Sequence, residues 1–343
     1  MIAHIGNDSL VAIACGGLAA AIVLALFLRR DRSGKLRRIA LVQIVLLLLS
    51  IASLIWLIVR QPASSAPNPE GQREWQLVGH GITEGISGLA LIAADANEAS
   101  FVAVHDNKQP GEKRLSIVRR RGGRIEARPL AWTGEPLPID LEAICRQPET
   151  ASTFLALTSR GSVYRFTLRS DAEVSFDPTP VGVPNSAEER QFESFDVQRI
   201  GTQTFACWAE RGDTAALGVV FCSTFDPPTL TFGEPRPLEV RAPWPAEHTR
   251  HISDLRLLTD GTILAASAAD PGNDGPFSSA VYIAGTLQPT ADGPQLSTAE
   301  PATRLFTTTA HKIEAIELVP GPHGGLLIGS DDENLGAAVL FTW

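Results

Sequence analysis

Residues 140–144, with the sequence Asp-Leu-Glu-Ala-Ile, are the clearest copy of a short signature that recurs along the chain. The second and fifth positions are apolar in every copy, and the third is Ser or Glu. The five copies are Gly85–Leu89, Asp140–Ile144, Gln191–Phe195, His251–Leu255 and Lys312–Ile316. Their third positions are 51 to 61 residues apart. A fixed spacing of this size indicates a repeated structural unit.

Each signature is followed by the same order of features, which the second copy illustrates. An apolar run at 154–157 leads to a polar turn at 158–161 and then to a third apolar run at 163–168. The first four copies continue into a fourth run. Units of four short strands predict an all-β, five-bladed β-propeller over residues 73–343. A β-sandwich is the competing fold, but it would not explain the repeated register.

The last unit ends too soon to supply its own fourth strand. We predict that residues 74–78, which precede the first signature and read as a strand, complete that blade and close the ring. The number of blades is less firmly fixed by the pattern. The propeller is six-bladed if a divergent blade is hidden in residues 226–250 or 286–310.

The first 60 residues differ in character from the rest. Two uncharged or nearly uncharged stretches, 10–28 and 39–59, are each long enough to cross a bilayer as a helix. The loop between them, 29–38, holds six basic side chains and one acid, which predicts a cytoplasmic loop. These features predict a two-helix transmembrane hairpin at 1–60, followed by a proline-containing linker at 61–72. A cleaved signal peptide is the alternative for the first stretch. A signal peptide carries its basic residues before the apolar run, however, whereas here they follow it.

The hairpin predicts a two-pass protein of the bacterial inner membrane, with the N-terminus and the propeller in the periplasm and the lipid bilayer as a partner. The chain outside the hairpin is acidic. Residues 61–343 contain 22 Lys or Arg and 36 Asp or Glu. Such a balance argues against nucleic acid as a partner, because phosphate neutralisation supplies most of that affinity.

In a propeller the third signature positions converge around the central channel. They contribute three carboxylates, Glu142, Glu193 and Glu314, and the polar turns add further acids, including Asp331. Oxygen ligands without a Cys/His cluster favour a hard cation, so the sequence predicts a Ca²⁺ site formed by these four residues. The alternative is structural, with the glutamates bonded to neighbouring amides or bases.

Basic residues accompany the acids. Arg160 and Arg211 occupy comparable turns, and Lys312 begins the last signature. These three side chains predict a site for a small anionic ligand. The alternative is that they form salt bridges with the glutamates. His105, His251 and Arg160 are the candidate catalytic residues. Histidines beside turns are also common as hydrogen-bonding spacers. The chain has no G-x-S-x-G, H-E-x-x-H or P-loop motif.

The cysteines give a separate test of the repeat. Cys207 and Cys222 lie on the second and third strands of the third unit, at equal distances from the turn between them. They are expected to face each other, either as a disulfide or as two buried thiols. Cys145 reads as a core residue with a free thiol.

Three segments resemble a known family. Asp140–Ile144, Lys312–Ile316 and the acidic loop Gly325–Gly336 are similar to the strands and loops of bacterial phytase-like β-propellers, the group with esterase-like activity of phytase. The resemblance implies a Ca²⁺-dependent phosphoester or ester hydrolase. It implies metal ligation by Glu142, Glu314 and Asp331, and phosphate contact by Arg160 and Lys312. Those phytases have six blades, whereas five units are visible here.

The sequence therefore supports two functional hypotheses. One is a metal-dependent hydrolase of phosphoesters or esters that acts at the central face. The other is a non-catalytic binding or scaffold module tethered to a membrane protein complex. Propellers serve many functions, so the fold does not choose between them.

Overall fold

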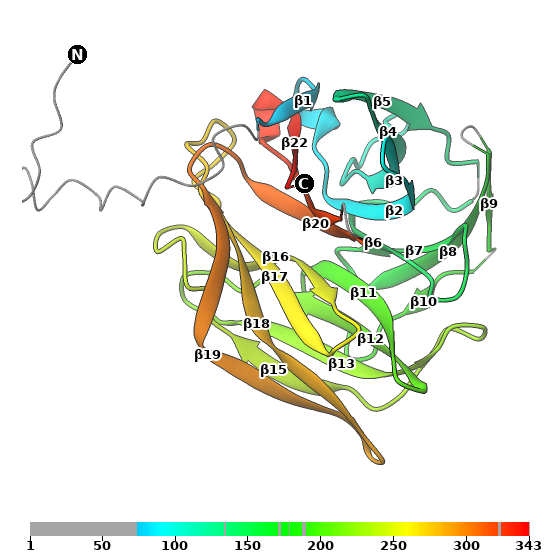
Figure 1. The fold of residues 1–343 in the computed structure, drawn as a ribbon, viewed down its shortest axis with the longest axis vertical. Coiled ribbons are helices and arrows are strands. Elements are labelled where there is room, and N and C mark those ends of the chain that lie inside the picture. Colours follow the sequence, from blue (N-terminus) through cyan, green and yellow to red (C-terminus); the bar gives the residue numbers. More distant parts are fainter. Residues whose placement is uncertain are drawn as a thin grey trace, which may run out of the picture. The chain divides into compact units, whose positions relative to one another are not determined.

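The computed structural model describes residues 74–133, 135–170, 173–177, 179–186, 190–321 and 324–342. These residues lie in one compact unit, 72–343. They form five antiparallel sheets that are arranged about a central axis (Figure 1). The predicted all-β, five-bladed propeller is therefore confirmed, and the sheets account for the two regions in which a sixth blade could have been hidden.

The first two blades follow one another along the chain. Blade 1 consists of β2 (Gly88–Ala94), β3 (Glu98–Val104), β4 (Leu115–Arg121) and β5 (Arg124–Leu130). Blade 2 consists of β6 (Leu141–Arg146), β7 (Thr153–Thr158) and β8 (Ser162–Ser170), with the short strands β9 (Glu173–Phe176) and β10 (Val181–Gly182) both paired to β8.

The next two blades have longer strands. Blade 3 consists of β11 (Phe192–Ile200), β12 (Gln203–Glu210) and β13 (Gly218–Asp226), with β14 (Thr231–Phe232) and β15 (Arg236–Val240) paired to β13. Blade 4 consists of β16 (Thr249–Leu257), β17 (Thr262–Ala269), β18 (Ser279–Thr290) and β19 (Gly293–Thr308). The two regions suspected of hiding a blade contribute outer strands to these two sheets.

Blade 5 is built from both ends of the propeller sequence. Its strands are β20 (Ile313–Val319), β21 (Gly325–Ser330), β22 (Ala337–Phe341) and, at the outer edge, β1 (Gln76–Gly79). Gln76 pairs with Val339 and Leu77 with Ala338 in the antiparallel ladder. The predicted closing strand is thus confirmed, and the last blade is hydrogen-bonded to the segment that leads into the first.

The hydrophobic core is divided among the blades. Five separate apolar clusters are present, and each lies between two neighbouring blades, so that every blade buries both faces of its sheet. The apolar runs of the inner strands follow from this burial on both sides. The inner strands β2, β6, β11, β16 and β20 each contact the two adjacent inner strands, which closes the ring.

The strand register confirms that the two predicted partner cysteines face each other. Cys207 pairs directly with Cys222 across β12 and β13, and the two form a disulfide. Cys145 is buried on β6 as a free thiol.

The prediction of a two-pass inner-membrane protein is contradicted. Within the described ranges the helices are two 3-10 turns, η1 (Ile82–Glu84) and η2 (Glu333–Leu335), and no helix is long and apolar enough to span a bilayer. A membrane span needs a continuous helix of about 20 residues, which an apolar run in the sequence does not by itself provide. The two predicted spans, the loop 29–38 and the linker 61–72 lie outside the described residues.

Candidate functional site

The repeated signature has a structural cause, which is a β-bulge. In blades 2, 3 and 5 the register between the inner strand and its neighbour shifts at the third signature position, which is Glu142, Glu193 or Glu314. In blade 4 the shift falls between Arg250 and Asp254 and includes Ser253. A bulge adds a residue to one strand and re-aims its side chain. It therefore turns the carboxylates out of the sheet faces and toward the channel.

We call the end of the channel at which the inner strands begin the acidic face. Its carboxyl groups come from three of the inner strands and from two connecting turns. They belong to Asp106, Glu142, Glu193, Glu314 and Asp331.

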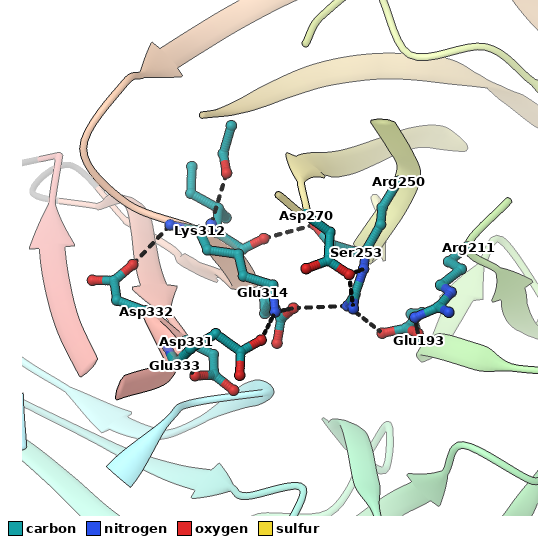
Figure 2. A network of polar contacts seen from close by, with 12 residues as sticks. Glu193, Arg211, Arg250, Ser253, Asp270, Lys312, Glu314, Asp331, Asp332 and Glu333 are labelled. Atoms are coloured by element: carbon teal, nitrogen blue, oxygen red, sulfur yellow. Dashed lines mark hydrogen bonds and ion pairs between the residues drawn. The ribbon is translucent and has the colours of Figure 1, made fainter. Parts of the chain in front are cut away.

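One guanidinium group joins two of these carboxylates. Nη1 of Arg250 lies 3.2 Å from Oε1 of Glu314 and 4.0 Å from Oε2 of Glu193 (Figure 2). Nη2 of the same side chain lies 2.6 Å from Oδ2 of Asp270. Arg250 thereby connects blades 3, 4 and 5. The exposed fractions of Glu193 and Glu314 are only 5% and 4%, so the cation offsets much of the cost of burying two charges.

Two more cations extend the network in opposite directions. Nζ of Lys312 lies 3.0 Å from Oε1 of Glu314 and also contacts Glu333. Nη1 of Arg211 lies 3.4 Å from Oε1 of Glu193. The sequence-predicted basic residues Arg211 and Lys312 are therefore salt-bridge partners of the glutamates, which is one of the two fates that the sequence left open.

Glu142 differs from the other glutamates. It is partly exposed and makes no hydrogen bond or ion pair with any residue that the structure describes. Burial within the channel raises its pKa well above the usual value, and the charge of Glu193 raises it further. Burial also raises the pKa of Glu193, but Arg250 and Arg211 act in the opposite direction. The two arginines therefore favour the ionised form of Glu193.

Asp331 also lies close to the channel. Its Oδ1 accepts a hydrogen bond from the backbone of Glu333 at 2.9 Å. Burial, and next the charge of Glu314, raise its pKa well above the usual value. A Cβ atom on Gly85 would lie 2.3 Å from Cγ of Asp331. Glycine at the first signature position of blade 1 thus leaves room for this carboxyl group.

The two candidate histidines form hydrogen bonds with neighbouring groups of the protein. His105 is buried, and its two ring nitrogens bond to the carbonyl of Gly85 and the hydroxyl of Ser116. Burial, and next the charge of Lys113, lower its pKa to about 3. Nδ1 of His251 accepts a hydrogen bond from the backbone of Ala242. These contacts match the spacer role that the sequence allowed for both residues.

Arg160 lies apart from this network. Its side chain is exposed, and Nη1 donates to the carbonyl of Arg190 at 3.5 Å. The sequence places Arg250 and Asp106 on the same face as the glutamates, but it does not identify either of them as a ligand or a catalytic residue. Arg250 directly precedes the fourth signature and Lys312 is the first residue of the fifth, so both basic residues lie close to a third signature position in the sequence.

The four predicted Ca²⁺ ligands do not form a metal centre in this arrangement. In the described part of the chain, no group of three or more His, Cys, Asp or Glu residues is placed to hold a metal ion. Glu193 and Glu314 already face Arg250 and Lys312, whose charges occupy the place that a cation would take. Among the described residues, this donor set therefore does not fit a resident metal.

Asp106 provides a test of the electrostatics. It has no hydrogen bond or ion pair to any described residue, and burial, followed by the charge of Glu314, raises its pKa to about 6. A carboxyl group with a raised folded-state pKa costs stability above that pKa, because the folded protein holds its proton more tightly. Asp106→Asn is therefore expected to stabilise the protein at pH 8 by about 1–3 kcal/mol.

The gain should shrink as the pH falls from 6 toward 4, because the native carboxyl group then becomes protonated and uncharged. Urea unfolding of the full-length chain at pH 8 and pH 4.5 measures both values. Asp213→Asn is the matched control, because hydrogen bonds from the backbone of Ala216 and Ala215 lower the pKa of that exposed carboxyl. A gain at pH 8 for both variants would contradict the argument.

Comparisons with known proteins find distant structural similarity, which carries no argument about this chain. No protein-family model and no curated protein matches the sequence. A thermostable family-43 glycoside hydrolase has 10% identity and a TM-score of 0.46, over 75% of this chain and 88% of its own. The endo-arabinase of Bacteroides thetaiotaomicron has 8% identity and a TM-score of 0.45, over 78% and 96%.

The α-L-arabinofuranosidase of Podospora anserina, solved with cellotriose, has 12% identity and a TM-score of 0.44, over 78% of this chain and 96% of its own. Similarity this low carries no information about activity. The fold assignment rests on the sheet topology and the closed ring of inner strands.

Proposed function

We propose that the acidic face is the active site of a hydrolase that uses two carboxyl groups as acid and base and acts on an uncharged, hydroxyl-rich substrate such as a glycoside. The observation that carries this proposal is the contrast between Glu142 and Glu193. Glu142 has no hydrogen-bond or ion-pair partner among the described residues, and burial raises its pKa well above the usual value, whereas Glu193 lies against Arg211 and Arg250. Environments that push apart the pKa values of neighbouring carboxyl groups assign an acid and a base.

In this proposal Glu142 donates its proton to the oxygen of the departing group. Glu193 takes a proton from the attacking water, and Arg250 orients its carboxylate. Glycosidic bonds are cleaved by such a pair of carboxyl groups, because the leaving oxygen needs a proton and the water needs a base. Arg250 and Lys312 hold Glu314 in place beside the pair.

The charge of the face favours a neutral substrate over an anionic one. Asp106, Glu142 and Asp331 have no cation within ion-pair distance among the described residues, whereas Arg211, Arg250 and Lys312 are each paired with a carboxylate. A phosphate group would meet this excess of acids without a free cation to receive it. The Ca²⁺-dependent phosphoester hydrolase that the phytase resemblance implies therefore has weaker support from these contacts.

A substrate panel tests the proposal. The full-length chain is assayed at pH 5–8 against p-nitrophenyl glycosides of common pentoses and hexoses, p-nitrophenyl phosphate and p-nitrophenyl acetate, with EDTA and with added Ca²⁺. We expect turnover of at least one glycoside that EDTA does not abolish. Faster turnover of the phosphate, or of any substrate only with Ca²⁺, would support the phosphoester hypothesis instead. No turnover of any compound would favour the non-catalytic binding module.

A further inference from the structure

A cavity lies at the opposite end of the channel from the acidic face, where the inner strands finish. It has a volume of about 760 Å³, and all five blades contribute to its lining. We call it the lower cavity. Its lining combines apolar residues, among them Leu91, Val197, Leu257 and Leu318, with polar and charged residues in about equal number. Arg146 and Arg199 line it as well. A concave apolar surface with a few buried polar groups is the usual form of a small-molecule site.

The floor of the lower cavity is a cluster of four charged residues, which we call the inner cluster; three of them are buried and Glu317 is partly buried. It consists of Asp196 on β11, Asp254 and Arg256 on β16, and Glu317 on β20. Asp196, Arg256 and Glu317 line the cavity directly. The cluster contains three carboxyl groups and a single guanidinium group.

The carboxyl groups of the inner cluster bond to the free inner edges of neighbouring blades. Oδ2 of Asp196 accepts a hydrogen bond from the backbone of Leu257 at 2.7 Å, and Oδ2 of Asp254 accepts one from Ile316 at 2.8 Å. Oε2 of Glu317 accepts one from Leu91 at 3.3 Å. These bonds satisfy amides that have no strand partner. They explain why the acids are present, but they do not balance their charge.

Arg256 balances only part of that charge. Its exposed fraction is 3%. Nη1 lies 3.3 Å from Oδ1 of Asp254, and Nη2 is directed to the carbonyls of Leu89 and Ile144. Nε lies 3.6 Å from Oε2 of Glu317 and has no hydrogen-bond partner among the described residues. The three carboxyl groups of the inner cluster therefore outnumber its single guanidinium group.

We propose that the lower cavity binds a small organic cation, an ammonium group on an apolar body, with the charged end at Asp196 and Glu317. The apolar residues of the lining suit the body of such a ligand, and its charge would balance the excess of acid in the inner cluster. An anionic ligand is disfavoured, because its charge would add to the excess at the floor. Arg199, on the wall, is already paired with Glu149. This site is separate from the acidic face, and the inference does not depend on the proposed hydrolase.

The pH dependence of binding follows from the groups that surround the floor. Strand β2 contributes no titratable side chain there, β6 contributes Cys145 and Arg146, and the other three inner strands contribute the inner cluster and Arg199. Glu149 and Asp260, which follow β6 and β16, also line the cavity. Burial raises the pKa of Asp196, Asp254 and Glu317, and Arg256 opposes the shift in each case. A bound cation would favour the ionised forms, so binding should release protons near neutral pH and weaken as the pH falls.

Calorimetry on the full-length chain with n-butylammonium, and with n-butyrate as the oppositely charged probe, tests the inference. We expect n-butylammonium to bind at pH 8 with a dissociation constant of about a millimolar or below. Glu317→Gln should weaken binding by about tenfold or more. The matched control Arg146→Gln removes a charge from the cavity lining and should bind n-butylammonium at least as well as the native chain. Circular dichroism establishes that each variant is folded.

If Glu317→Gln does not fold, Asp196→Asn replaces it, and the native chain supplies an independent measurement. Native binding of n-butylammonium should be several-fold weaker at pH 5 than at pH 8, with proton release at pH 7 detected by comparing two buffers. Three outcomes would each overturn the inference. The first is no binding when the concentration of n-butylammonium is 50-fold above the expected dissociation constant. The second is binding of n-butyrate that equals or exceeds that of n-butylammonium. The third is binding of n-butylammonium that is unchanged both in the acidic-residue variant and at pH 5.

Discussion

Arg256→Met is expected to lower the free energy of unfolding at pH 8 by about 3–5 kcal/mol, because it leaves the three carboxyl groups of the inner cluster without their cation. The side chain also donates to backbone carbonyls on two other blades, those of Leu89 and Ile144. Methionine fills a similar volume and has no donor, so the variant removes the charge and the hydrogen bonds together. Unfolding of the full-length chain in urea measures the loss.

The size of this loss should depend on pH. The three carboxyl groups have raised pKa values, that of Asp254 being about 7, so they take up protons in the folded state as the pH falls. At pH 5 the Arg256→Met variant should therefore recover part of its stability relative to the native chain. Arg146→Met is the control, since that arginine is exposed and lies outside the inner cluster. Equal losses for the two variants at pH 8 would refute the role assigned to Arg256.

Glu142→Gln is expected to reduce turnover of a cleaved glycoside by about 10²–10⁴-fold, the usual contribution of a general acid. Glutamine has nearly the same shape but no proton to donate to the leaving oxygen. The loss should be large for a poor leaving group, such as a simple alcohol. It should be much smaller for dinitrophenol, which departs without a proton. This dependence on the leaving group separates a general acid from a residue that only holds the site together.

The pH profile provides a second measurement on the same variant. Because the pKa of Glu142 is raised by burial and by Glu193, native activity should fall as the pH rises through that value. The glutamine variant should lack this alkaline limb. Glu126→Gln, on the outer strand β5, is the matched control and should behave like the native chain in both respects. A loss in Glu142→Gln that is the same for every leaving group would rule out the acid role.

The architecture was largely predictable because a propeller repeats one local pattern. Five copies of the signature predicted five blades, and the missing strand of the last copy predicted that residues 74–78 would close the ring. Cys207 and Cys222 were placed opposite each other by their distances from one turn. These predictions needed only the order of strands and turns. The apolar stretches before residue 60 carried no comparable constraint, and the location inferred from them was wrong.

The site was predictable only in part. The convergence of Glu193, Glu314 and Asp331 follows from their place in the repeat, but their partners depend on side-chain reach. Arg250 extends from blade 4 to carboxylates on blades 3 and 5, and no spacing in the sequence encodes such a contact. For the same reason, the sequence could not determine whether the basic residues would bind a ligand or the glutamates.

The inner cluster was missed although the repeat contained it. Asp196, Arg256 and Glu317 each follow the third signature position by three residues, in three successive copies. In a regular strand, the residues two and four positions after the third signature position would point in the same direction as it does. The bulge at the third position adds one residue, so the next residue toward the channel comes three positions later. An allowance for the bulge would have found a second ring of polar residues.

The pairing of β1 with β22 also bears on how the protein is made. Residues 76–79 emerge from the ribosome early, yet their hydrogen-bonding partner, residues 337–341, is among the last parts of the propeller to be translated. At ordinary elongation rates the interval is on the order of 10–60 seconds. During that time residues 76–79 have no strand to pair with, so closure of the ring depends on a late, long-range contact. A chaperone has an opportunity to bind the unpaired segment in that interval.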